Sequence, residues 1–433
     1  MRHLIPWLLL GCAVPAAHAA PPLALTHATL IDGSGSPAET DRTVVIRGER
    51  IDAVFASGSR PLPKDARVEN LRGRFLIPGL IDAHVHLSGA ESSMAGYRPL
   101  LRALLRGGVT SIRDMAGDDR LLGYLALRAN TDALPSPDIV YAALLSGPSF
   151  FAEDPRAQAA SVGMPLGTAP WMQAIRDTTD IPLAVAEARG TGATGVKLYA
   201  NLSAALVRRV ATEAHRQGLE VWTHATVFPA RPGDAVAAGA DTISHSPYLV
   251  WEAAPTVPAD YRVRAHGDFR RIAADAAPIL ALLKEMKARG TILDATVGAF
   301  RREAKEHPDQ VGAGIVSWSY AVTRLAHRQG VLIDAGSDSA GLPSEAHGPD
   351  LGGPPLVHEE MGLLVAHCGF TPIEAIEAAT RISAMAMGHG ADRGTITAGK
   401  FADLVVLTAD PSRDIGNTRR IAFVIKHGRI YPE

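Results

Sequence analysis

Short apolar segments that favour β-structure alternate with longer segments of helical periodicity along most of the chain. Residues 194–200 (TGVKLYA) are β-favouring, residues 203–218 (SAALVRRVATEAHRQG) have helical spacing and end in glycine, and residues 219–226 (LEVWTHAT) return to a strand pattern. This succession predicts a βαβ unit with parallel strands. Further strands are expected over 75–87, 109–115, 138–145, 241–246, 291–297 and 331–337. Together these strands predict an α/β chain folded as a (β/α)8 TIM barrel.

The two ends of the chain consist of short strands split by Gly and Asp turns. They are LALTHATLIDGSG and RTVVIRGERIDAVF near the amino terminus, and ADLVVLTAD and IAFVIKHGRIY near the carboxyl terminus. We expect both ends to form one small β-sandwich, from residues 20–78 and 395–433, beside a barrel spanning 79–394. After the third barrel strand, residues 147–171 are rich in Pro, Gly and aromatic residues, and long segments of this kind often cover an active site.

The first residues of the chain differ in character from the rest. Arg2 and His3 precede the apolar run LIPWLLLGCAV, which leads into the small-residue stretch PAAHAA. This order is typical of a secretory signal peptide over residues 1–19, cleaved after Ala19, and predicts a periplasmic or secreted protein. LLGC ending at Cys12 also resembles a lipoprotein box, so a protein anchored at Cys12 is the alternative. The apolar run is well short of the ~20 residues that span a membrane.

Charge and cysteine content narrow the range of partners. The formal net charge of −2 provides no broad basic surface for nucleic acid or anionic lipid, and a small molecule is the expected substrate. After cleavage Cys368 would be the remaining cysteine, so we expect neither an intrachain disulfide nor a zinc–thiolate site. A homo-oligomer is compatible with this composition.

The segment GLIDAHVHLS, residues 79–88, places His84 and His86 one residue apart at the end of an apolar run. In a strand, residues i and i+2 point to the same face, so both imidazoles would project into the barrel mouth from the end of its first strand. Two imidazoles in that position are able to bind one metal ion. A single His-x-His pair is more often simple packing, so the metal interpretation needs further ligands.

Metal-binding groups recur at the ends of the later barrel strands. Lys197 ends the fourth strand, His224 the fifth, His245 the sixth and Asp338 the eighth. Each has an ordinary explanation by itself, as a surface lysine, a core histidine or a helix cap. That all of these groups lie at the same end of the predicted strands would require several independent coincidences. Jointly they predict a metal site in the barrel mouth.

These motifs resemble those of the amidohydrolase superfamily. The resemblance covers nearly all of the mature chain, through IPGLIDAHVH, GVTSIRD, GVKLYA, VWTHAT, TISHS and AGSDS to GTITAGKFADLVVLTADPSRDI. The chain is most similar to the branch of the prolidase-like metal-dependent dipeptidases and imidazolonepropionase, in which strand 4 carries a lysine. After His224, the turn containing Thr226 is longer and poorer in glycine than in many relatives, so the substrate rim is expected to differ.

The resemblance implies a metal-dependent hydrolase that cleaves the carbon–nitrogen amide bond of a dipeptide or an N-acyl amino acid. It implies two divalent ions, expected to be Zn²⁺, bridged by a Lys197 that carbon dioxide has carboxylated. One ion would be held by His84, His86 and Asp338, and the other by His224 and His245. An ammonium beside two cations is strongly disfavoured, whereas a carbamate is an anionic ligand with two oxygens. A hydroxide shared by the ions would attack the carbonyl, with Asp338 as general base.

Two other functions fit the same residues. A mononuclear enzyme with an uncarboxylated Lys197 would open a cyclic amide or a lactone. A non-catalytic exported protein would bind a metal or ligand without turnover, although binding alone does not require both a full ligand set and a base.

Four further residues are candidates for contact with the substrate. Tyr199 shares the strand face of Lys197 and would bind a substrate carboxylate or an oxyanion, unless it packs as an aromatic at the top of the barrel. Arg113 and Asp114 end the second strand near the mouth, where they form either a structural ion pair or substrate contacts. His358 follows the eighth strand and either reaches the rim or begins an exposed helix.

Overall fold

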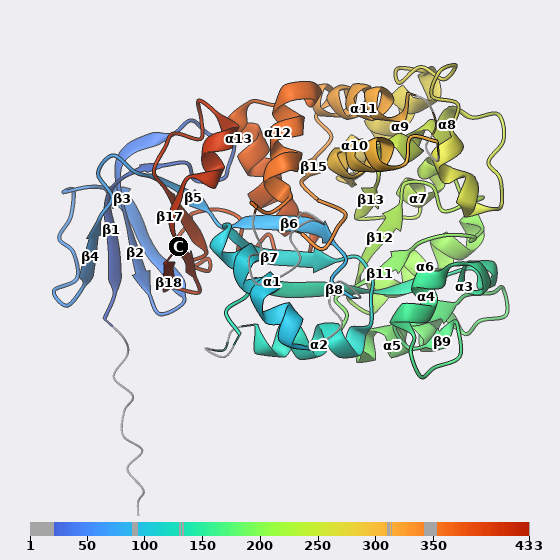
Figure 1. Cartoon of the computed structure of the whole chain (residues 1–433), viewed down its shortest axis with the longest axis horizontal. Helices are drawn as coiled ribbons and strands as arrows, with labels where there is room; N and C mark the ends of the chain where they lie inside the picture. The colour runs from blue at the N-terminus through green and yellow to red at the C-terminus, as the bar shows by residue number, and fades with distance from the viewer. Residues whose placement is uncertain are drawn as a thin grey trace, which may run out of the picture.

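The computed structural model describes residues 21–88, 94–129, 131, 134–309, 312, 314–341 and 353–432. The expected signal peptide, its cleavage site after Ala19 and the alternative anchor at Cys12 lie outside these residues. Figure 1 shows a sheet built from both ends of the chain beside a larger body in which helices surround parallel strands. In the described part of the chain, no helix is both long and apolar enough to cross a membrane.

Parallel strands follow one another around the larger body. They are β6 (Leu80–Val85), β7 (Val109–Asp114), β8 (Asp138–Ser146), β11 (Gly195–Leu198), β12 (Glu220–His224), β13 (Thr242–Ser244), β14 (Ile292–Asp294) and β15 (Ile333–Asp334). Each pairs with the next along the chain. The chain after the last strand, β15, pairs with the first strand, β6. Ala83 N donates to Ala335 O (2.9 Å), and Val85 forms a β-bridge with Ser339. The predicted TIM barrel is thereby confirmed in nearly closed form.

Helices cover the outside of the barrel (Figure 1). The main ones are α1 (Met94–Arg106), α2 (Asp119–Arg128), α5 (Ile181–Gly190), α6 (Ala204–Arg216), α7 (Pro232–Ala237), α9 (Ala277–Arg289), α10 (Val297–Glu306), α11 (Ile315–Gln329), α12 (Val357–Cys368) and α13 (Pro372–Glu377). The helix expected over 203–218 is α6. Ser203 accepts a hydrogen bond from Leu206 N at its start, and its apolar face, with Val207 and Val210, is buried.

The strands of both chain ends form one hydrogen-bonded sheet. They are β1 (Leu23–Leu30), β2 (Glu39–Arg47), β3 (Arg50–Ala56), β4 (Arg67–Asn70), β5 (Phe75–Pro78), β16 (Leu404–Leu407), β17 (Ile421–Lys426) and β18 (Arg429–Pro432). The order is β18-β17-β16-β5-β1-β2-β3, with β4 on β1, so the two ends meet where β5 pairs with β16. Leu25 and Ile46 share one apolar cluster with Val406 and Ile425, which holds the two ends together.

The single strand expected over residues 75–87 is in fact two strands. β5 belongs to the sheet of the chain ends and β6 to the barrel, and the chain passes between them at Gly79. Gly79 N donates to Asp403 O (2.7 Å), and a Cβ at this position would lie 2.1 Å from Thr110 Oγ1. Only glycine fits this close crossing, which divides one continuous apolar run between two sheets.

The long segment after β8 folds against the mouth of the barrel. It contains α3 (Pro148–Glu153), α4 (Pro155–Ala160), β9 (Thr168–Ala169) and β10 (Met172–Ala174). β10 pairs in parallel with the end of β8, which ties the segment to the barrel. Its buried Phe150 lies 4.9 Å, between ring centroids, from Tyr199, the residue that follows β11. The segment therefore reaches the strand ends, where its composition predicted a cover.

Candidate active site

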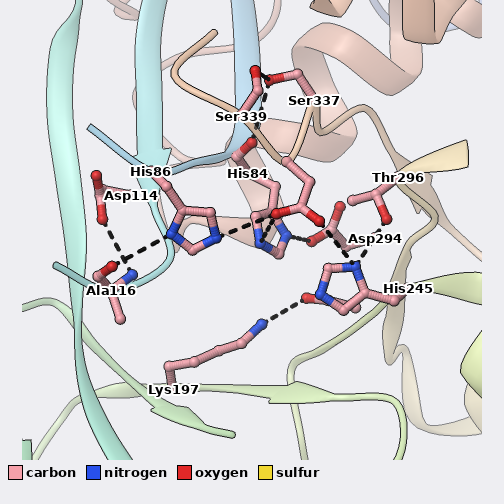
Figure 2. A network of polar contacts seen from close by, with 12 residues as sticks. His84, His86, Asp114, Ala116, Lys197, His245, Asp294, Thr296, Ser337 and Ser339 are labelled. Carbon is pink, nitrogen blue, oxygen red and sulfur yellow. Dashed lines mark hydrogen bonds and ion pairs between the residues drawn. The ribbon is translucent and has the colours of Figure 1, made fainter. Parts of the chain in front are cut away.

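The six predicted metal ligands lie together at the carboxyl ends of the barrel strands. His84 is in β6 and His86 follows it, Lys197 is in β11, His224 ends β12, and His245 and Asp338 follow β13 and β15. Figure 2 shows the side chains of His84 and His86, from the end of β6, beside those of Lys197 from β11 and His245 from the end of β13. Parallel strands end at one rim, so residues far apart in the sequence meet there.

Asp338 interacts with three of the histidines. Its Oδ1 lies 3.4 Å from His84 Nε2 and 3.2 Å from His86 Nε2, and its Oδ2 lies 3.7 Å from His245 Nδ1. His84, His245 and Asp338 each offer a ligand atom within 4.8 Å of the others. Ring nitrogens and a carboxylate oxygen gathered in this way are a donor set that suits Zn²⁺ and related divalent ions.

The protonation states of these residues also suit a metal. Burial lowers the pKa of His84 and places the pKa values of His224 and His245 well below their usual range, so these rings are neutral at neutral pH. Burial opposes ionisation of Asp338, but His84, His245 and His86 hold its pKa well below the usual value. Burial also opposes the charge of His86, but Asp338 raises the pKa of this ring, so His86 loses a proton when it binds a metal ion. Neutral imidazole and ionised carboxylate are the forms that bind metal ions. The residues present therefore fit a divalent metal centre.

Lys197 and His224 extend the cluster on its other side. The ring of His224 lies 4.5 Å from that of His245 and 5.8 Å from that of Tyr248. Lys197 Nζ donates to Ser244 Oγ (3.0 Å), and burial lowers the pKa of this lysine to about 7. A large fraction of the amine is therefore unprotonated near neutral pH, which is unusual for a lysine.

Asp294, at the end of β14, belongs to the site although the sequence analysis did not select it. Its Oδ2 lies 2.5 Å from His84 Nδ1, and Figure 2 shows it on the opposite side of the His84 ring from His86. Burial opposes its charge, but His84 and Arg113 keep the pKa of Asp294 below its usual value. His84 therefore donates Nδ1–H to Asp294 and presents Nε2 to the cluster. The available signal was its position in the seventh predicted strand, 291–297.

The backbone is strained at several residues that follow barrel strands. Ala116, His245, Thr296 and Asp338 have positive φ angles of 121°, 78°, 47° and 50°. Such conformations cost of order 1–3 kcal/mol in non-glycine residues and collect at functional sites. Two of the four are predicted ligands, and Thr296 Oγ1 lies 2.9 Å from His245 Nδ1. The strained residues thus carry or support the cluster.

Aromatic and arginine side chains line one side of the mouth beside His224. The Tyr199 ring lies 4.1 Å from the His224 ring and 6.1 Å from the Tyr261 ring. The Tyr199 hydroxyl accepts a hydrogen bond from Arg156 (2.9 Å), and the guanidinium carbon of Arg264 lies 5.3 Å from the Tyr261 ring centroid. We call Tyr199, Tyr261, Arg156 and Arg264 the mouth wall. Tyr199 is thus at the mouth, where both of its predicted roles stay open.

Arg113 and Asp114, at the end of β7, have structural roles. Both side chains are fully buried, and their polar groups are used in contacts within the protein. Arg113 lies 3.3 Å from Asp334 Oδ2 and 3.5 Å from Asp294 Oδ2, and Asp114 accepts two backbone N–H groups at 2.7 and 3.1 Å. Arg113 therefore forms an ion pair, but with carboxylates of β14 and β15. Adjacent strand residues point to opposite faces, so Asp114 is not its partner.

His358 lies away from the mouth and does not reach the rim; it is at the start of a helix, as one alternative predicted, but it is buried and not exposed. It is buried in α12, with Nδ1 2.9 Å from Thr418 Oγ1 and Nε2 2.9 Å from Gly107 O. Gly107 precedes β7, so this histidine is at the amino-terminal end of the barrel. Burial lowers its pKa to about 4, and the neutral ring serves as a packing and hydrogen-bonding element.

Comparison with known proteins defines the class of the protein. Residues 75–431 match the Amidohydrolase family, and the chain belongs to it. Two curated relatives are imidazolonepropionases. That of Caulobacter vibrioides is 28% identical over 439 residues and covers 93% of this chain and 96% of its own. That of Deinococcus radiodurans is 26% identical over 414 residues, with coverages of 87% and 88%.

Solved structures share the whole architecture. A Xaa-Pro dipeptidase with bound methionine in the active site has a TM-score of 0.72 at 21% identity, over 95% of this chain and 100% of that one. A prolidase from Bifidobacterium longum, described as putative, has a TM-score of 0.67 at 24% identity, over 95% of each chain. These likenesses concern the fold. With the family match, the chain is a hydrolase of the amidohydrolase superfamily that acts on carbon–nitrogen bonds.

Proposed function

We propose that the protein hydrolyses the amide bond of a dipeptide or an N-acyl amino acid with the help of two divalent metal ions, expected to be Zn²⁺. The observation that carries the proposal is the position of Lys197. Its buried amine acts electrostatically on all four histidines of the cluster and has a pKa of about 7. A buried lysine among metal-binding side chains is costly as a structural element, since its charge has no carboxylate within ion-pair distance in the described part of the chain.

Carboxylation of Lys197 would resolve this cost. The unprotonated Nζ adds through its lone pair to the carbon of carbon dioxide and then loses a proton, which leaves an anionic carbamate with two oxygens. The carbamate would bridge the ions, while an ammonium at the same place would repel them. His84, His86 and Asp338 would hold one ion, and His224 and His245 the other.

The side chains of this chain account for proton transfer and orientation. Two bound divalent ions lower the pKa of water and polarise a carbonyl oxygen. Asp338 is ionised, so it is able to accept the proton of the attacking water and to donate it to the leaving amine nitrogen. Asp294 and Thr296 hold the rings of His84 and His245 in place before substrate binds.

The test combines a substrate screen with metal analysis. Purified protein should hold two ions per chain and turn over members of a library of dipeptides and N-acyl amino acids. Lys197→Ala should lose metal and nearly all activity, with partial rescue by a short carboxylic acid that replaces the bridge. The control Lys284→Ala, at an exposed position of α9, should retain both. A wild type loaded with metal that turns over no member of the library would refute the proposal and favour a non-catalytic binding protein.

A second candidate is a mononuclear cyclic amidase or lactonase. It is favoured by the compact group of His84, His245 and Asp338, which suffices for one ion, and by the imidazolonepropionase relatives. One ion per wild-type chain, with Lys197→Ala still active, would favour this candidate over the binuclear one.

We also propose export to the periplasm. The signal-like order of residues 1–19 supports it. The intact mass of protein from the native host should match a soluble chain that begins at Ala20. A chain that begins at a diacylglyceryl Cys12 would instead establish the lipoprotein.

A further inference from the structure

The mouth wall contains more positive than negative charge. Arg156 is paired with Asp154 Oδ2 (2.5 Å), which also accepts a hydrogen bond from the Tyr261 hydroxyl (2.9 Å). Among the described residues, Arg264 takes part in no ion pair within 4.0 Å. The Glu303 carboxylate interacts electrostatically with Arg264, but from a greater distance. Arginine stays protonated at every accessible pH. One guanidinium charge therefore faces the mouth without a carboxylate of its own.

Arg264 is held in position beside the metal cluster. It lies in the 3-10 helix η2 (Tyr261–His266), where Trp251 Nε1 donates to its carbonyl oxygen (3.2 Å). Its guanidinium carbon lies 5.3 Å from the centroid of the Tyr261 ring, and the group also interacts with Tyr248. The Tyr248 ring in turn stacks on His224 at 5.8 Å and 27°. The charge is thus fixed about one aromatic ring away from a proposed metal ligand.

A second guanidinium is close by. Arg156 reaches the wall from α4 through the Tyr199 hydroxyl, and it acts electrostatically on Arg264. Two guanidinium groups on one wall, with Asp154 as the paired carboxylate, repel each other, and a further anion bound between them would offset this repulsion. Guanidinium groups bind carboxylates through parallel N–H···O bonds, which makes a carboxylate the best-matched anion.

We propose that Arg264, with Arg156 and Tyr199 beside it, binds a free carboxylate of the substrate. The inference rests on the proposed amide hydrolysis. It adds that the enzyme recognises the carboxylate of the leaving amino acid. With the scissile bond at the metal cluster, the carboxylate on the wall belongs to the amino acid that is released. Substrates with a C-terminal amide, and neutral cyclic amides or lactones, would bury the guanidinium without a counter-charge and react poorly.

The activity test compares each responsive dipeptide with its C-terminal amide. In the wild type, kcat/KM for the acid should exceed that for the amide by about 10- to 150-fold, the range of a charge-assisted hydrogen bond. Arg264→Met should lower this ratio because it slows hydrolysis of the acid much more than that of the amide, and Arg264→Lys should restore part of the ratio. The control is Arg262→Met in the same helix, an exposed residue paired with Asp260 (2.8 Å), which should keep the ratio.

A binding test makes the inference independent of turnover. L-Methionine and L-methioninamide are titrated calorimetrically into wild-type protein loaded with metal and into the same variants, after thermal melting has shown them folded. The wild type and Arg262→Met should bind the acid at least tenfold more tightly than the amide, and Arg264→Met should not. Absence of any preference in the wild type, or its persistence in Arg264→Met, would overturn the inference. Selective binding without turnover of any dipeptide would refute the proposed function and leave the carboxylate site standing.

Discussion

The two ends of the barrel hold buried charge in different ways. At the amino-terminal end, Asp138 begins β8 and is paired with Lys426 (2.7 Å), Arg393 (2.8 Å) and His427 (2.9 Å). Burial opposes its charge, but these neighbours keep the pKa of Asp138 far below its usual value. At the mouth, Asp338 faces His84 and His245, whose pKa values burial lowers, and His86, where burial opposes the charge but Asp338 raises the pKa. The first carboxylate is paired with a lysine and an arginine, which stay charged, whereas the second faces imidazoles, which bind a metal ion once they are deprotonated.

The two clusters differ in whether permanent positive charge lies beside their ligand atoms. Asp138, Asp403 and His427 also bring ligand atoms within 4.8 Å of one another, as three residues of the mouth do. Arg393 and Lys426 already supply permanent positive charge at the amino-terminal end, and they would repel a divalent ion. The same ligand geometry therefore serves stability at one end of the barrel and is suited to metal binding at the other.

The largest effect is expected from removing the base at the mouth. Asp338→Asn keeps the shape and one ligand oxygen but is unable to accept a proton, so kcat should fall about 10²- to 10⁴-fold with a much smaller change in KM. Much of the metal should remain, as measured by elemental analysis beside steady-state kinetics. Asp275→Asn, at an exposed position, is the control. Wild-type kcat with two ions bound would show that the proton goes elsewhere.

At the opposite end, the corresponding substitution should affect stability. Asp138→Asn leaves Lys426 and Arg393 without this carboxylate, and the free energy of unfolding in urea should fall by about 3–5 kcal/mol, as for other broken buried ion pairs. The kcat of the folded fraction should not change. Asp52→Asn, which removes an exposed 3.7 Å pair with Arg47, should cost less than about 1 kcal/mol. Loss of metal from folded Asp138→Asn would erase the contrast between the two ends.

The buried His358 at the amino-terminal end should make stability depend on pH. Its pKa in the folded chain is about 4, below the 6.5 of an ordinary histidine, so the unfolded chain binds the proton first as the pH falls. The stabilisation is therefore complete above pH 6.5 and lost as the pH falls to about 4. At 1.36 kcal/mol for each pKa unit, the wild type should lose about 3 kcal/mol more than His358→Gln over this interval in urea unfolding. If the free energy of unfolding fell equally with pH in the wild type and in His358→Gln, another residue would be the titrating group.

A smaller effect is expected from the residue behind His84. Asp294→Asn weakens the hold on Nδ1–H, and loss of such an outer partner typically reduces metal affinity 10- to 100-fold. Competition with a chelator of known affinity measures the change. Unaltered affinity would show that packing alone orients the His84 ring.

The sequence was informative wherever the signal was local. The alternation around 194–226 predicted β11, α6 and β12 nearly to the residue, because side-chain periodicity is set within each element. The His84–His86 spacing and the recurrence of ligands at strand ends predicted a single site only with one further rule. This rule is that the parallel strands of a barrel end at one rim. The uncertain elements were those that a long-range contact decides, such as the division of residues 75–87 at Gly79.

The sequence by itself determined the barrel, its family and the six candidate metal ligands that meet at the mouth, because each depends on local periodicity, strand direction and motif. Only the tertiary structure decided that Asp294 orients His84, that Arg113 pairs with Asp334, and that His358 belongs to the opposite end of the barrel. These partners are more than 200 residues apart for the first two and 251 for His358 and Gly107. Which side chains meet at such separations depends on how the strands close around the barrel and how its helices pack, and no local pattern in the chain encodes it.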